Sequence, residues 1–251
     1  MSDLRDIFTK LESAEAEAKA RIPDPAPEAA PQSAPPGPAA PDPENRRPIS
    51  SRNSRFAQSA ARRLAESDIT PNQISQASMA CGALGLLLLW GAGATAGPLQ
   101  AMALILAALT MQARLICNLL DGMVAVEGGK TSPTGSFWNE APDRVADVLF
   151  LWGAGLAAGQ PALGLAAAAL AIGTAYIREL GRAEGFKPDF RGPMAKPHRM
   201  AALTAGCLAA ALLPWGTAMG LLTLTLWIVI LGTLGTILRR SHSLLQAMNA
   251  R

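Results

Sequence analysis

The sequence predicts an all-α integral membrane protein with six transmembrane helices, an N-terminal juxtamembrane amphipathic helix and a disordered N-terminal tail. Of the 251 residues, 50% are hydrophobic and only 16% are charged, whereas soluble domains carry roughly a quarter charged residues. Long apolar stretches alternate with short segments that hold nearly every Lys and Arg. Each stretch approaches the roughly 20 residues that a helix needs to cross a bilayer.

The first 70 residues divide into two predicted regions. Residues 1–50 are expected to form a disordered cytoplasmic tail, because their Pro- and Ala-rich composition buries too little apolar surface to fold. Residues 51–70 are expected to form an interfacial amphipathic helix. Phe56, Ala60 and Leu64 recur every fourth residue, as in helices that lie on an anionic membrane surface. The alternative is an ordinary basic juxtamembrane segment.

Residues 71–241 contain the predicted spans. Thr70 is a good N-cap and Pro71 suits the first helical position, so a helix is expected to begin there. The spans are expected at residues 73–94, 98–120, 137–158, 161–181, 199–215 and 217–238.

The distribution of basic residues predicts that both termini are cytoplasmic. The connections after the first, third and fifth spans contain no Lys or Arg, which instead gather on the opposite side of the spans. Lys and Arg accumulate in cytoplasmic connections. The basic residues lack interleaved aromatic residues, so nucleic acid is not an expected partner.

Polar residues collect at the end of the second predicted span and the start of the third, where ionisable groups are costly and usually functional. One helical stripe contains Arg114, Asn118, Asp121 and Ala125, and a second contains Asn139, Asp143 and Asp147. A tight connection is expected to set the stripes face to face. Oxygen ligands without nearby His or Cys suit a hard cation such as Mg²⁺ or Mn²⁺. The structural alternative is that Arg114 snorkels or pairs with Asp121, while the aspartates of the third span lie at the membrane interface.

The cluster resembles the motif of the CDP-alcohol phosphotransferase (CDP-alcohol phosphatidyltransferase) family, D-x-x-D-G-x-x-A-R-x8-G-x-x-x-D-x-x-x-D. The matching positions are Asn118, Asp121, Gly122, Ala125, Val126, Gly135, Asn139 and Asp143. All spacings and five of the eight identities are kept. The six-span plan and the Thr-Pro-Asn sequence before the first span are also similar to this family, and the resemblance extends over residues 51–241.

The resemblance implies a transferase of phospholipid biosynthesis in a bacterial-type inner (plasma) membrane. Such an enzyme moves a substituted phosphate group, for example a phosphatidyl group, from a CDP-alcohol such as CDP-diacylglycerol to a hydroxyl acceptor and releases CMP. The implied partners are the CDP-linked lipid or alcohol, the hydroxyl acceptor, membrane lipids and a second copy of the chain in a homodimer.

The resemblance also implies roles for individual residues. One or two Mg²⁺ or Mn²⁺ ions would be held at Asn118, Asp121, Asn139 and Asp143, and Asp143 would deprotonate the acceptor. The substrate would lie against Gly122, Ala125, Gly135, Lys196 and Arg199. Other interpretations stay open, because small residues also serve helix packing and basic residues beside a span also contact anionic lipids.

Three positions depart from the motif, since Asn118 and Asn139 stand at two aspartate positions and Val126 stands at the arginine position. An Asn side chain offers one neutral carbonyl oxygen and cannot bridge two cations as a carboxylate does. Possible auxiliary groups are Glu140, Asp147 and Arg114, the last as a substitute for a cation. A one-metal enzyme, a two-metal enzyme with recruited carboxylates and a pseudoenzyme therefore remain open.

The leading functional hypothesis is an active phosphotransferase. The alternative is a catalytically inactive homologue that acts as a lipid- or nucleotide-binding membrane scaffold. A third hypothesis, an unrelated small transporter, would call for internal repeats, and none is visible in the sequence.

Overall fold

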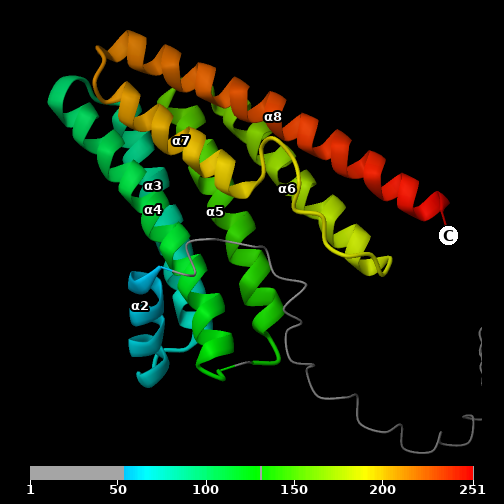
Figure 1. Cartoon of the computed structure of the whole chain (residues 1–251). Helices are drawn as coiled ribbons and strands as arrows, with labels where there is room; N and C mark the ends of the chain where they lie inside the picture. The colour runs from blue at the N-terminus through cyan, green and yellow to red at the C-terminus, as the bar shows by residue number, and fades with distance from the viewer. Residues whose placement is uncertain (1–53, 131, 251) are drawn as a thin grey trace, which may run out of the picture. The chain divides into compact units, whose positions relative to one another are not determined.

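The computed structural model describes residues 54–130 and 132–250. The predicted tail of residues 1–50 lies outside the described residues. Within the described ranges the chain forms seven α-helices and no strand, which confirms the all-α prediction (Figure 1). The helices are α2 (Arg55–Glu66), α3 (Pro71–Gly93), α4 (Gly97–Glu127), α5 (Gly135–Ala157), α6 (Pro161–Ala183), α7 (Lys196–Ala210) and α8 (Trp215–Asn249).

Four helices are long and apolar enough to cross a membrane, namely α3, α6, α8 and the part of α4 at Gly97–Val126. Helix α7 has 15 residues, which at about 1.5 Å per residue is shorter than the roughly 30 Å hydrocarbon core of a bilayer. Helix α5 has 23 residues, but its first half is rich in charged side chains. The apolar helices support an integral membrane protein, while the count of six spans stays a prediction.

Helix α3 begins where the sequence predicts it. The Thr70 hydroxyl accepts a hydrogen bond from the Gln73 amide at 3.2 Å, and the Gln73 side chain accepts one from the Thr70 amide at 2.9 Å. The side-chain amide of Asn72 donates to Ser132 and Thr134, both at 3.4 Å. The Thr-Pro-Asn sequence therefore caps α3 and also ties its first turn to the connection between α4 and α5.

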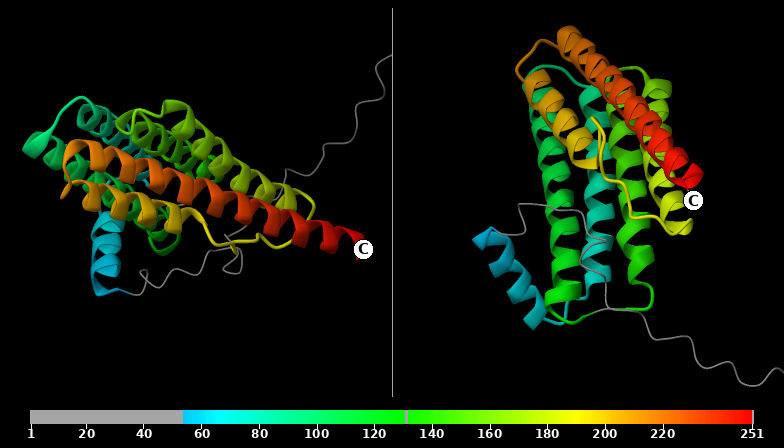
Figure 2. Two further views of the ribbon diagram at one scale, coloured as in Figure 1. Left: turned by 90° about the horizontal axis from the view of Figure 1, so that it is seen from above. Right: turned by 45° about the vertical axis from the view of Figure 1, so that its right-hand side comes forward.

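Helix α3 packs extensively against both α4 and α5, whereas α4 and α5 approach each other at few positions. Figure 2 shows α3 between them in its right-hand view. The sequence analysis expected direct packing to set the two polar stripes face to face. Instead, α4 and α5 pack directly against each other at few positions. The stripes meet through long basic side chains, because α3 separates the two backbones over most of their length.

The connection between α6 and α7 folds back along the bundle, so that α7 begins partway along the neighbouring helices (Figure 1). Gly192 on this connection has a φ of 137° and lies against Thr236 of α8, where a Cβ atom would collide. The Thr236 hydroxyl also accepts a hydrogen bond from the Met194 amide at 2.9 Å. This anchoring explains why α7 starts at Lys196, earlier than the span expected at 199–215. The helix also ends earlier than expected, at Ala210.

The basic N-terminal helix α2 packs on α4 through small residues. Ala57 and Ala61 are buried against Met123 and Val124, whereas Phe56 is 72% exposed. The face of α2 that contacts α4 therefore begins one residue after the predicted stripe of Phe56, Ala60 and Leu64. The Lys130 ammonium donates to the carbonyl oxygens of Leu64, Ser67 and Ile69, which ties the end of α2 to the connection between α4 and α5.

Candidate functional site

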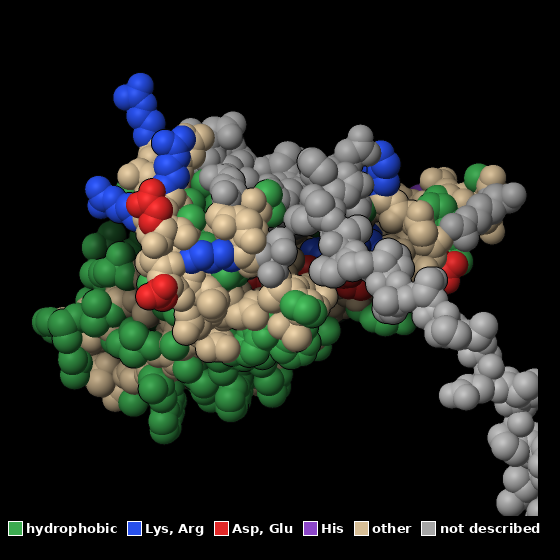
Figure 3. Space-filling model, turned by 90° about the horizontal axis from the view of Figure 1, so that it is seen from below, with side chains coloured by type: hydrophobic (Ala, Val, Ile, Leu, Met, Phe, Trp, Pro, Cys, Tyr) green, Lys and Arg blue, Asp and Glu red, His purple; other side chains and the backbone are tan. Residues whose placement is uncertain are grey.

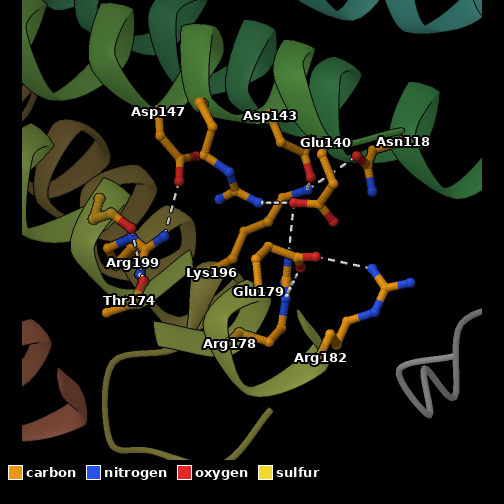
Figure 4. A network of polar contacts seen from close by, with 12 residues as sticks. Asn118, Glu140, Asp143, Asp147, Thr174, Arg178, Glu179, Arg182, Lys196 and Arg199 are labelled. Atoms are coloured by element: carbon orange, nitrogen blue, oxygen red, sulfur yellow. Dashed lines mark hydrogen bonds and ion pairs between the residues drawn. The ribbon is translucent and has the colours of Figure 1, made fainter. Parts of the chain in front are cut away.

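Basic side chains from α4 and α7 meet the acidic side chains of α5 in a buried network (Figure 4). On α4, Arg114 is 0% exposed. Its Nη2 donates to Asp143 Oδ1 at 2.9 Å, to the Asp143 carbonyl at 3.1 Å and to Asp147 Oδ1 at 3.3 Å. Its Nε and Nη1 have no hydrogen-bond partner among the described residues. Arg114 therefore bridges the two aspartates and keeps further donors inside the site.

Lys196, the first residue of α7, links α4 to α5. Its ammonium donates to Asn118 Oδ1 at 2.9 Å and also contacts Asp143 Oδ2. With Arg114 on the other oxygen, both carboxylate oxygens of Asp143 accept from cations. The position of Lys196 follows from the folded-back connection, which delivers the start of α7 to the middle of the polar network (Figure 4).

Arg199 lies one turn further along α7 and is 1% exposed. Its guanidinium donates to Asp147 Oδ2 at 2.8 Å, to Thr174 Oγ1 at 3.3 Å and to the Met194 carbonyl at 3.0 Å. Asp147 thus accepts from Arg114 on one oxygen and from Arg199 on the other. Arg199, which the resemblance linked to the substrate, and Asp147, a possible auxiliary group, form an ion pair with each other.

Asp121 is 5% exposed and lies on α4 outside these ion pairs. Its Oδ2 accepts from the Ser75 hydroxyl at 2.7 Å, while Oδ1 is buried without a hydrogen-bond partner in the described ranges. Beside it, a Cβ added to Gly122 would meet nothing within 4 Å. A buried carboxylate oxygen without a partner calls for a cation or a donor, so Asp121 Oδ1 is a candidate position for one.

The remaining residues of the predicted site lie further from the network. Asn139 is exposed, and its side chain makes no hydrogen bond within residues 54–130 and 132–250. Ala125 on α4 is half-buried, and Gly135 is the first residue of α5, close to Ser132. Glu140 accepts from Arg144 at 2.6 Å and from Arg178 of α6 at 2.5 Å. Glu140 is therefore engaged in ion pairs that tie α5 to α6.

Sequence analysis did not identify Ser75, Thr174 and Glu179 as members of the site. Ser75 satisfies Asp121, Thr174 accepts from Arg199, and Glu179 pairs with Arg178 at 2.8 Å. Ser75 lies in the first turn and a half of α3, three residues after the Asn of the Thr-Pro-Asn sequence. Its position after that sequence could have indicated that it belongs to the site. Nothing in the local sequence distinguishes Thr174 from other helical threonines.

A second basic region lies on the connection before α7. Asp189 pairs with Arg191 at 3.0 Å, and the Arg240 side chain of α8 donates to the carbonyl oxygens of Arg191 and Thr174 at 2.9 and 2.8 Å. Burial opposes ionisation of Asp189, but hydrogen bonds from Arg191 outweigh it and lower the pKa of Asp189. Part of this region lines a cavity of about 220 Å³ between α6 and α8.

Charged side chains gather at the end of the bundle that carries the α4–α5 connection. Figure 3 views that end and shows red and blue side chains together near the middle, beside a large green hydrophobic surface. The three connections without Lys or Arg lie at the opposite end (Figures 1 and 2). The charge asymmetry expected from the sequence therefore corresponds to the two ends of one bundle.

The donor set determines which cation these residues could hold. No group of three or more His, Cys, Asp or Glu side chains is arranged to hold a metal ion in the part of the chain that the structure describes. The oxygen atoms near Asp121 suit a hard ion, and Mg²⁺ is usually bound by one or two carboxylates together with substrate phosphates. The residues therefore fit one such ion at Asp121 that a substrate helps to hold, and they do not fit a two-ion centre.

Comparison with solved structures identifies the fold. No protein-family model and no curated protein matches the chain. The phosphatidylinositol phosphate synthase of Mycobacterium tuberculosis with CDP-DAG bound has a TM-score of 0.63 at 21% identity, covering 76% of this chain and 94% of that chain. Its complex with manganese and citrate has a TM-score of 0.62 at 20% identity, covering 75% and 88%. The apo form gives 0.58 at 21%, covering 73% and 93%.

That synthase is a member of the CDP-alcohol phosphotransferase family, the family whose motif the sequence resembles. The similarity extends over most of both chains. The chain has the fold of these phosphatidylinositol phosphate synthase structures.

Proposed function

We propose that this protein is a membrane phosphotransferase of phospholipid biosynthesis. It transfers a substituted phosphate group, such as a phosphatidyl group, from a CDP-alcohol such as CDP-diacylglycerol to a hydroxyl acceptor. The observation that carries the proposal is the buried site around Asp121 and Asp143, two motif carboxylates on a fold shared with a synthase solved with CDP-DAG. Asp121 Oδ1 lacks a hydrogen-bond partner among the described residues.

The reaction replaces the phosphoanhydride bond of the diphosphate with a phosphoester bond to the acceptor. The acceptor oxygen bonds to the phosphorus that carries the alcohol or lipid, the bond from that phosphorus to the bridging oxygen breaks, and CMP leaves with the bond's electron pair. Asp143 accepts the hydroxyl proton, and Arg114 and Lys196 orient this carboxylate. Arg114 also retains buried donors that suit phosphate oxygens.

A divalent ion, Mg²⁺ or Mn²⁺, would be held by Asp121 and would neutralise negative charge on the diphosphate. The chain's own contribution is to bury Asp121, to fix its other oxygen with Ser75 and to leave open space at Gly122. The resemblance suggests that the cytidine nucleotide binds against Gly122, Ala125 and Gly135.

CMP release tests the proposal. Purified protein in detergent, supplied with CDP-diacylglycerol, Mg²⁺ and a panel of hydroxyl acceptors, is expected to release CMP with at least one acceptor. Asp121→Ala and Asp143→Ala are each expected to lower turnover at least a hundredfold, which is about 2.7 kcal/mol of transition-state stabilisation. Asp189→Ala is the control, because Asp189 forms an ion pair outside the site. Unchanged turnover in either site variant would contradict the assignment.

A second candidate function is a catalytically inactive scaffold that binds a CDP-linked lipid. It is favoured by one observation, namely that both oxygens of Asp143 and of Asp147 accept from basic side chains. Such a protein would bind CDP-diacylglycerol and release no CMP with any acceptor.

The proposal includes six spans with both termini cytoplasmic, a homodimer and a bacterial-type inner membrane. Reporter fusions within the α3–α4, α5–α6 and α7–α8 connections are expected to report the non-cytoplasmic side. A cytoplasmic signal from any of the three would contradict the six-span arrangement.

A further inference from the structure

The charges of the site balance within the protein itself. Three carboxylates, those of Asp121, Asp143 and Asp147, face three basic side chains, those of Arg114, Lys196 and Arg199. Charges in a low-dielectric site interact strongly and are costly to leave unbalanced. The described part of the site is thus close to neutral before any ligand enters.

Lys196 occupies a particular place in this balance. Its ammonium lies between Asn118 Oδ1 and Asp143 Oδ2, the side chains at the first and last acidic positions of the motif that the sequence resembles. A neutral Asn accepts one hydrogen bond from an ammonium without adding negative charge. The substitution of Asn for Asp at position 118 is therefore matched by a monovalent organic cation at the same place.

We propose that the Lys196 ammonium replaces one of two divalent cations, so that the centre binds a single divalent ion at Asp121, together with the diphosphate of its substrate. This inference rests on the proposed function and deepens it. Two divalent ions with a diphosphate diester, which carries two negative charges, would add two net positive charges to a balanced buried cluster. One divalent ion with the same diphosphate adds no net charge.

The coupling of ion and substrate follows from the ligands at hand. Asp121 Oδ1 is the motif carboxylate oxygen without a hydrogen-bond partner among the described residues, whereas both oxygens of Asp143 are engaged. One carboxylate oxygen holds a divalent ion weakly, and phosphate oxygens complete its coordination. Ion and nucleotide therefore bind cooperatively, and by reciprocity each raises the affinity of the other by the same factor.

Binding of Mn²⁺, followed by the loss of the electron paramagnetic resonance signal of the free ion, tests the proposal on the full chain in detergent. Wild-type protein is expected to bind Mn²⁺ weakly alone, and to bind one ion per chain at least tenfold more tightly in the presence of CDP. Lys196→Met frees Asn118 Oδ1 and Asp143 Oδ2, and is expected to gain Mn²⁺ binding without CDP. Lys196→Arg retains the positive charge and is expected to behave like the wild type.

Lys187→Met is the matched control, because it removes the same charge from an exposed residue outside the site, and it should leave Mn²⁺ binding unchanged. Two tightly bound ions per wild-type chain would overturn the proposal, as would affinity that is independent of CDP. If Lys196→Met does not yield monodisperse protein, the wild-type measurements with and without CDP decide alone.

The readout separates this inference from the proposed function. Two bound ions together with CMP release would overturn the role of Lys196 and leave the phosphotransferase intact. One CDP-dependent ion without CMP release from any acceptor would support the single-ion site and contradict the catalytic function. CMP release that persists in a strong chelator would overturn the single-ion site alone.

Discussion

The two halves of α5 are held in place by different interactions. From Gly135 to Asp147, ion pairs connect it to Arg114 of α4, Arg178 of α6 and the basic residues of α7. The second half carries no charge and packs backbone against backbone, with Gly155 so close to Gly164 of α6 that an added Cβ would lie 2.8 Å from its Cα. Close packing at one end fixes the helix, so that the other end can present two carboxylates to basic partners.

The largest expected effect comes from the charged half. Asp147→Ala removes the acidic partner of buried Arg199 and one of the two acidic partners of buried Arg114. The loss is expected to cost about 3–5 kcal/mol of stability. Thermal unfolding in detergent measures it. Asp189→Ala is the control, since it breaks an aspartate–arginine pair whose arginine is largely exposed, and such pairs contribute about 1 kcal/mol or less. Equal losses in both variants would show that burial of the Asp147 pair adds nothing.

The packed half gives the next largest effect. In Gly164→Ala the new Cβ would lie 2.5 Å from the Leu151 carbonyl oxygen and 2.9 Å from Gly155 Cα, and these backbone atoms yield little. Overpacking of this kind is expected to cost about 1–3 kcal/mol. Gly220→Ala in α8 adds a methyl group where nothing lies within 4 Å, so its unfolding midpoint should equal or exceed that of the wild type. A Gly164→Ala protein as stable as the control would mean that α5 and α6 pack less closely.

The fold was predictable from sequence where local signals act. Helix α3 was expected at 73–94 and occupies Pro71–Gly93, and α6 was expected at 161–181 and occupies Pro161–Ala183, because Thr70 caps one and a proline opens each. Helix α7 was predicted less well. Its start depends on the contact of Gly192 with Thr236 in α8, and local periodicity carries no information about that contact.

The site likewise contains residues that local sequence spacing predicts and residues that only the tertiary fold brings together. The spacing of three and four residues placed Asp143 and Asp147 on one face of α5, and Arg114 contacts both. Asn139, four residues before Asp143 and closer to the start of α5 at Gly135, is exposed instead. The contact of Lys196 with Asn118 joins residues 78 positions apart, which only the tertiary fold brings together.

Substitutions of Asp for the two Asn residues are therefore expected to change Mn²⁺ affinity unequally. Asn118→Asp places a carboxylate beside the Lys196 ammonium and near Asp121, and is expected to raise Mn²⁺ affinity roughly tenfold, about 1.4 kcal/mol. Asn139→Asp changes an exposed side chain and should alter affinity less than about twofold, since exposed charges are screened. Mn²⁺ titration of the two single variants measures the difference. Equal gains would place Asn139 in the site and contradict the described geometry.

The smallest expected effect concerns pH and the Asp189–Arg191 pair outside the site. Folding lowers the pKa of Asp189, so its ionised form stabilises the fold above the unfolded pKa of about 3.9, and that contribution disappears as the pH falls through the lower, folded pKa. Because Arg191 is largely exposed, Asp189→Asn should lose less than about 1 kcal/mol at pH 7. The stabilities of the two proteins should converge as the pH falls below the lowered, folded pKa of Asp189. A difference that grows in acid would reverse the assigned sign.

Anomalous diffraction tests most directly how many divalent ions the site holds. One divalent ion and the ammonium of Lys196 are expected where the motif implies a two-ion centre. Crystals of the full chain grown with Mn²⁺ and a CDP-linked lipid would be measured at the manganese absorption edge. One anomalous peak is expected beside Asp121, with the Lys196 ammonium still in contact with Asp143. Two peaks in the site, with Lys196 displaced from Asp143, would contradict this expectation.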